Sequence, residues 1–77
     1  MTLEDFDKIE QLADEAMKEH PEWRKGQAFF NVLYTLFPDV ANEIRGSSVD
    51  MFYDSSKINE FKTMLEDGMI GTHPPEQ

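Results

Sequence analysis

RKGQAFFNVLYTLF, residues 24–37, is a segment whose apolar side chains would fall on nearly every side of a helix. A helix of that kind has to be covered by neighbouring elements on several sides. We therefore predict a central helix that runs from about Pro21 or Glu22 to Phe37. The adjacent Phe29 and Phe30 would point about 100° apart on it, so both are buried only if the packing wraps around the helix.

An amphipathic helix is predicted before it, over residues 3–19. Its apolar side chains recur every three or four residues, namely Leu3, Phe6, Ile9, Leu12, Ala13 and Ala16. We expect Thr2 to cap its N-terminus, and the carboxylates of the first turn interact favourably with the helix dipole. Pro21 is expected to end this helix, because proline disfavours helical geometry at the preceding residue, His20.

The rest of the chain predicts two shorter helices. Residues 38–46 are expected to form one that is closed by Gly46, and residues 55–66 another that is capped by Asp54 or Ser55. The side chains expected to face inward from these two helices are Val40, Ala41, Ile44, Ile58, Phe61, Met64 and Leu65.

Residues 47–53 lack a helical pattern and are predicted to form a loop or a short extended piece. Four apolar side chains of this segment are expected to lie across the helices: Val49, Met51, Phe52 and Tyr53. Gly68 is expected to stop the last helix. The sequence thus predicts a compact all-α domain of three to four helices over residues 1–68, with a flexible C-terminal tail over residues 69–77.

The 77 residues carry 16 acidic and 7 basic side chains, a net charge of −9. Such a field repels phosphates and anionic lipids, so we expect no direct binding to nucleic acid or membranes. The chain has no cysteine, which removes disulfides, thiol nucleophiles and cysteine-ligated metals. Its N-terminus is acidic where a signal peptide is basic, and no apolar run reaches the roughly 20 residues that cross a bilayer. We expect a cytoplasmic protein.

Residues that would support catalysis or metal binding are sparse. The two histidines, His20 and His73, stand at a helix break and in the predicted tail, and neither has a second ligand at helical spacing. The run from Asp50 fails as a calcium loop, because Phe52 and Phe61 occupy positions that need oxygen ligands. We predict a protein without catalytic activity, cofactor or metal.

Three polar side chains interrupt the apolar central helix on one face: Arg24, Gln27 and Asn31. We call them the polar stripe. Two interpretations stay open: the stripe faces water or a partner, or it belongs to a buried hydrogen-bonded network. In the second case, Asp50 or Asp54 would accept hydrogen bonds from Arg24.

Gly26 stands beside the polar stripe, inside the predicted helix. A helical glycine costs about 0.5–1 kcal/mol relative to alanine, which indicates a local need for space. We expect close approach of another backbone, or of a ring such as that of Trp23 or Tyr53.

The sequence also resembles a set of small uncharacterised proteins of phages and bacteria. The shared order is Arg-x-Gly-Gln-Ala-x-x-Asn-x-Leu over residues 24–33, then FPDVANEIRGS, then Asp-x-Phe-Tyr over residues 50–53. The chain departs from it at Met51, where proline is frequent. The resemblance implies a fold and a phage context, and brings no activity with it. Residues that match the pattern are candidates for defining the fold or for binding: Arg24, Gly26, Gln27, Asn31, Asp50, Phe52 and Tyr53.

Most of the net charge lies in the first predicted helix. Its carboxylates either form a solvated face or contact a partner with a basic surface, and the candidates for contact are Glu4, Asp7, Asp14 and Glu15. We expect a protein-binding module, phage-encoded and acting as an accessory protein or modulator of a host protein in the host cytoplasm. Two alternatives stay open: a DNA mimic in the nucleic-acid site of a host protein, and a structural homodimer, which an exposed Phe29 or Tyr34 would favour.

Overall fold

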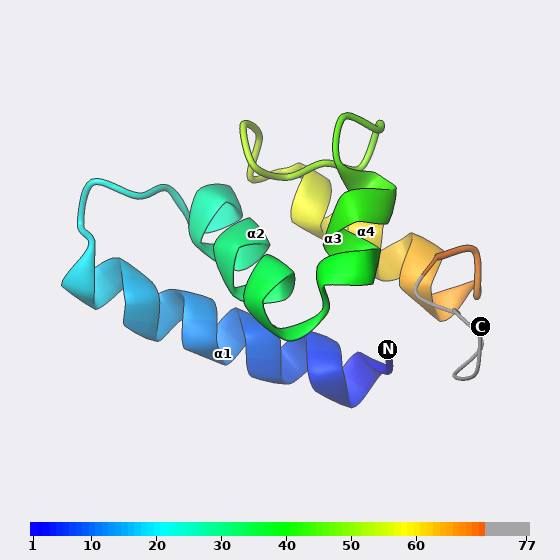
Figure 1. Cartoon of the computed structure of the whole chain (residues 1–77), viewed down its shortest axis with the longest axis horizontal. Helices are drawn as coiled ribbons and strands as arrows, with labels where there is room; N and C mark the ends of the chain where they lie inside the picture. The colour runs from blue at the N-terminus through cyan, green and yellow to red at the C-terminus, as the bar shows by residue number, and fades with distance from the viewer. Residues whose placement is uncertain (71–77) are drawn as a thin grey trace.

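The computed structural model describes residues 1–70 as four helices joined by short turns and one irregular loop (Figure 1). The helices are α1 (Leu3–Glu19), α2 (Lys25–Leu36), α3 (Pro38–Ile44) and α4 (Lys57–Glu66). The chain returns along α1 as the antiparallel α2, and then turns sharply into α3. Residues 1–70 contain no strand, so the predicted all-α fold is confirmed.

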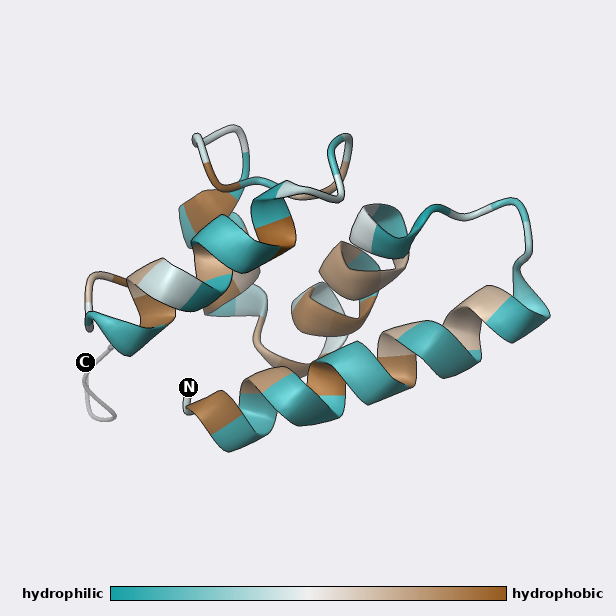
Figure 2. Cartoon of the chain, turned by 180° about the vertical axis from the view of Figure 1, so that it is seen from behind, coloured by the Kyte–Doolittle hydropathy of each residue, from teal (hydrophilic) through white to brown (hydrophobic). Residues whose placement is uncertain are grey.

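The first helix begins as its sequence predicts, and it buries half of its predicted apolar residues. Thr2 Oγ1 accepts a hydrogen bond from the Asp5 N–H at 3.1 Å, and the Thr2 N–H donates to Asp5 Oδ2 at 2.9 Å. This reciprocal pair satisfies two backbone donors at the helix start. Phe6, Ile9 and Ala13 are buried, and Figure 2 shows α1 as hydrophilic along most of its length, with hydrophobic residues at recurring positions.

The start of α2 differs from the prediction, because the helix begins at Lys25 and not at Pro21 or Glu22. Residues 20–23 close a turn in which the Trp23 N–H donates to the His20 carbonyl oxygen at 2.9 Å. The His20 imidazole stacks on the Trp23 indole with ring centroids 4.0 Å apart. Arg24 is extended, with φ −82° and ψ 163°. The turn therefore uses the residues that the sequence assigned to the first turn of the helix.

Three phenylalanine rings join α1, α2 and α4 at the centre of the core. The centroids of Phe6 and Phe29 are 5.1 Å apart, and Phe61 lies 6.1 Å from Phe6 and 5.9 Å from Phe29. Phe29 and Phe30 are both buried, which confirms that packing wraps around α2. The predicted inward residues of α3, namely Val40, Ala41 and Ile44, are buried as well.

The loop between α3 and α4 sends some of its apolar residues inward and others outward. Val49 and Met51 are buried, and the Phe52 ring stands edge-on to Phe30 at 5.7 Å. Tyr53 is 87% exposed, so the expectation that it lies across the helices is wrong. Its ring meets that of Phe52 at 4.7 Å, within a turn in which the Asp54 N–H donates to the Met51 carbonyl oxygen at 3.2 Å.

The last helix begins at Lys57, later than predicted, because residues 54–56 form a turn that precedes it. The Asp54 carboxylate accepts hydrogen bonds from the Ser56 N–H at 3.0 Å and from the Ser56 hydroxyl at 2.6 Å. At the other end, Gly68 has a φ of 74°, a conformation that suits glycine as a helix stop. Ile70 is buried, so the core uses a residue beyond the expected domain limit at 68. The remainder of the predicted tail, 71–77, lies outside the described residues.

Candidate partner-binding groove

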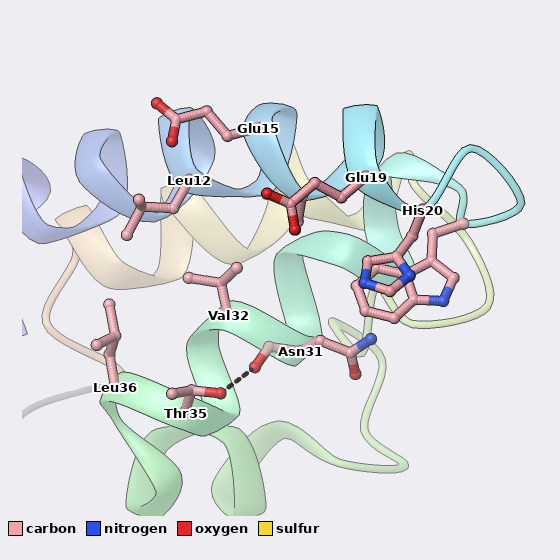
Figure 3. Close-up of a pocket in the computed structure, with 10 residues that line it drawn as sticks. Leu12, Glu15, Glu19, His20, Asn31, Val32, Thr35 and Leu36 are labelled. Atoms are coloured by element: carbon pink, nitrogen blue, oxygen red, sulfur yellow. Dashed lines mark hydrogen bonds between the residues drawn. The ribbon is translucent and has the colours of Figure 1, made fainter.

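An open groove of about 410 Å³ runs between α1 and α2 (Figure 3). Its walls come from both helices and from the turn between them. The lining residues are Leu12, Glu15, Ala16, Glu19, His20, Trp23, Asn31, Val32, Thr35 and Leu36. We call it the α1–α2 groove.

The floor of the α1–α2 groove is apolar. Leu12 and Ala16 of α1 face Val32 and Leu36 of α2, and Leu36 is 44% exposed. Leu12 and Ala16 belong to the apolar face of α1, and Val32 and Leu36 to the wide apolar surface of α2, yet none of the four is fully buried. The apolar circumference of α2 is wider than α1 and the short α3 cover, so the surplus is left facing solvent.

The two rims of the groove differ in charge. Glu15 and Glu19 stand on the α1 side, whereas Asn31 and Thr35 form a neutral polar rim on α2. Among residues 1–70, no lysine or arginine lines the groove. Within residues 1–70, neither Glu15 nor Glu19 forms an ion pair, so their charges stay available to a partner.

One end of the groove is closed by the stacked rings of His20 and Trp23. His20 Nδ1 also lies 3.5 Å from Glu22 Oε2, and both side chains are exposed. The half-buried Trp23 presents a flat apolar wall, a type of surface that often dominates binding energy in protein interfaces.

The polar stripe lies at the surface. Arg24 is exposed, and Gln27 and Asn31 are half-buried. Residues 1–70 contain no buried polar side chain, and the three side chains of the stripe make no hydrogen bond there, so the buried-network interpretation is wrong. Asn31 instead borders the α1–α2 groove.

The loop that Arg24 was expected to hold is fixed by other contacts. Asp50 accepts hydrogen bonds from the Gly46 N–H at 2.8 Å and the Phe52 N–H at 3.0 Å, while Asp54 binds Ser56. The two carboxylates therefore brace their own loop, and the expected pairing with Arg24 does not form in residues 1–70.

Gly26 makes the contact between α2 and this loop. Its N–H donates to Ser55 Oγ at 2.8 Å, and a Cβ at this position would overlap the Met51 carbonyl oxygen. The expected close approach of another backbone is confirmed, because the three atoms nearest to such a Cβ are all backbone atoms. The sequence analysis missed Ser55 in this role, because nothing local links two residues that are 29 positions apart.

The structure places only one of the four acidic residues predicted to contact a partner at the groove. Glu4, Asp7 and Asp14 are exposed on α1 but do not line the groove, whereas Glu15 does. The sequence analysis did not name Glu19, and it did not predict that Leu12, Ala16, Val32 and Leu36 would share one partly exposed surface. The mismatch between the wide apolar face of α2 and the few helices that cover it was the available signal.

A second, smaller hollow of about 220 Å³ lies on the other side of α2. It is lined by Phe30, Arg45, Asp50, Phe52 and Tyr53. The Arg45 guanidinium lies 5.3 Å from the centroid of the Tyr34 ring and 5.8 Å from that of Phe30. Its cation therefore already has aromatic partners within the chain.

Neither a metal centre nor a membrane span emerges from the described part of the chain. Residues 1–70 hold no group of three or more histidine and acidic side chains that could bind a metal ion. Among the helices found there, none combines the length and apolar character that crossing a membrane requires. No protein-family model, curated protein or solved structure matches this chain.

Proposed function

We propose that this chain is a small, acidic, non-enzymatic protein-binding module whose α1–α2 groove receives an apolar and positively charged segment of a partner protein. The observation that carries the proposal is the apolar floor beneath an acidic rim. Leu36 is 44% exposed there, and Glu15 and Glu19 are free of ion pairs within residues 1–70.

The two features of the groove serve different steps of binding. The net charge of −9 attracts a basic partner over a distance and raises the rate of encounter. Burial of Leu12, Val32 and Leu36 against the partner then removes apolar surface from water and slows dissociation of the complex. Charge selects the partner and apolar contact retains it.

The biological setting we favour is that of a phage-encoded accessory protein that modulates a host protein in the cytoplasm. The support for it is the sequence pattern of residues 24–33 and 50–53, together with the acidic surface. The groove supplies the contact through which such modulation would act.

The test is affinity capture from a lysate of the native host with three proteins: the wild type, Leu36→Gln and Leu3→Gln. Leu3 is the matched control for Leu36. Both are leucines of similar exposure, 40% and 44%, but only Leu36 lines the groove. We expect a stoichiometric partner that Leu36→Gln loses and Leu3→Gln retains. Equal capture by both variants would contradict the proposed site.

A second pair of variants separates the groove rim from the acidic surface in general. Glu15→Lys with Glu19→Lys and Asp7→Lys with Asp14→Lys change the net charge equally, and only the first pair borders the groove. We expect the first pair to reduce capture more. The four-lysine variant at Glu4, Asp7, Asp14 and Glu15 should retain helicity and capture less of a basic partner.

The same experiment distinguishes the two alternatives. Release of the partner by duplex DNA would favour a DNA mimic that uses the exposed carboxylates of α1. A concentration-dependent dimer in light scattering, with no captured partner, would favour self-association; Tyr34, at 44% exposure, is the feature that supports it.

A further inference from the structure

We infer that the occupant of the α1–α2 groove is an amphipathic helix that carries two cationic side chains one turn apart on one flank. This inference rests on the proposed function and names the kind of segment that binds. It follows from the walls of the groove, from its size and from the placement of its charges.

The walls favour a ligand that satisfies its own backbone hydrogen bonds. The two long walls are helices, whose backbone N–H and C=O groups pair within α1 and α2 except at the helix ends. The Thr35 hydroxyl is also used, because it donates to the Asn31 carbonyl oxygen at 3.0 Å. An extended peptide would find no open strand edge here and would leave its backbone groups unpaired. A helical ligand has no such need.

The spacing of the lining residues suits packing against a ligand helix. Leu12, Glu15, Ala16 and Glu19 lie at i, i+3, i+4 and i+7 on α1, and so form a single ridge. That ridge is about 10 Å long, the length of two helical turns. The small side chain of Ala16 at its middle allows a ligand helix to approach closely, as in ridges-into-grooves packing.

The charges specify one flank of the ligand. Glu15 and Glu19 are four residues apart, which places them about 6 Å apart along the axis of α1. Two lysines or arginines at i and i+4 on a ligand helix have the same spacing. The opposite rim, Asn31 and Thr35, is neutral, so the other flank of the ligand needs polar but uncharged residues.

Three synthetic peptides of 18 residues test this inference directly. The first is an amphipathic helix with leucines at i, i+3, i+4 and i+7, two lysines at i and i+4 on one flank, and glutamine and alanine elsewhere. The second replaces the two lysines with glutamates. The third keeps the lysines but carries a central proline, which breaks the helix. Binding of each is measured by fluorescence anisotropy at low ionic strength.

We expect the lysine peptide to bind the wild type, and each of the other two to bind about tenfold more weakly. The protein variant Glu15→Lys with Glu19→Lys should reverse the preference and bind the glutamate peptide more tightly. The control variant Asp7→Lys with Asp14→Lys should keep the preference for lysine. Circular dichroism checks that every variant is folded.

If the proline peptide bound as tightly as the lysine peptide, the inference of a helical ligand would be wrong. If the Glu15→Lys with Glu19→Lys variant still preferred the lysine peptide, the pairing of the ligand's cations with Glu15 and Glu19 would be wrong. Absence of peptide binding, with capture of a partner that still depends on Leu36, would reject this inference and leave the proposed function standing. If capture is also independent of Leu36, the proposed function fails as well.

Discussion

Gly26 lies directly against the carbonyl oxygen of Met51, so that a Cβ atom at position 26 would overlap that oxygen and lie 3.0 Å from the Ser55 Cα. The Gly26 N–H also donates to Ser55 Oγ at 2.8 Å. Glycine is needed here for space, since the neighbour is backbone and cannot rotate away. This contact joins the first turn of α2 to the loop that precedes α4.

Gly26→Ala should destabilise the domain. Overpacking against a fixed backbone costs about 1–3 kcal/mol, which exceeds the roughly 0.5–1 kcal/mol that alanine gains over glycine in a helix. Urea unfolding followed by circular dichroism measures the change. Gln27→Ala is the matched control, because its half-buried side chain makes no hydrogen bond within residues 1–70. A Gly26→Ala protein as stable as the wild type would show that the loop moves freely.

Ser55→Ala should lower the free energy of unfolding by about 1 kcal/mol, because the Gly26 N–H loses its acceptor. Arg24, the N-cap residue of α2, offers no side-chain hydrogen bond, so Ser55 acts as a cap supplied from another part of the chain. Ser48→Ala is the control, at an exposed serine of the same loop. If both variants had the same stability, the hydrogen bond would contribute nothing.

Asn31→Ala should change the free energy of unfolding by less than about 0.5 kcal/mol, as is usual for surface positions. The side chain is half-buried and makes no hydrogen bond within residues 1–70. Thermal and urea unfolding both test this. A loss of about 1–3 kcal/mol would instead reveal a stranded polar partner and restore a structural role for the polar stripe.

The Asp54 carboxyl should titrate below its ordinary pKa of 3.8. The Ser56 hydroxyl is the main cause, followed by the Ser56 N–H, and both stabilise the charged carboxylate. A carboxyl pKa that is lower in the folded state than in the unfolded state stabilises the fold at pH values above the unfolded-state pKa. That contribution is lost as the pH falls through the folded-state pKa. Carboxyl chemical shifts against pH measure it. Ser56→Ala should raise the Asp54 pKa towards 3.8, and an unchanged pKa would contradict the assigned cause.

Much of this fold is readable from the sequence because its signals are short-range. Thr2, Gly46 and Gly68 mark helix ends through their own backbone or side-chain chemistry, and periodic apolar residues predict the buried faces. The predicted start of α2 was wrong, since Pro21 is compatible with a first helical turn, whereas the hydrogen bond from the Trp23 N–H to the His20 carbonyl oxygen and the stacking of their rings form a separate turn there.

The sequence by itself predicted an all-α domain of three to four helices, an acidic surface, and a central helix too apolar to stand alone. Only the tertiary structure decided which of those apolar residues are covered. Phe29 is buried, and Leu36 and Tyr34 are left exposed, because coverage depends on the length and angle of neighbouring helices and not on the residue itself. The arrangement of neighbouring segments also decides three other features: the α1–α2 groove, the exposure of Tyr53 and the hydrogen bond from the Gly26 N–H to Ser55 Oγ. Each depends on where distant segments meet in space, and no local pattern encodes that.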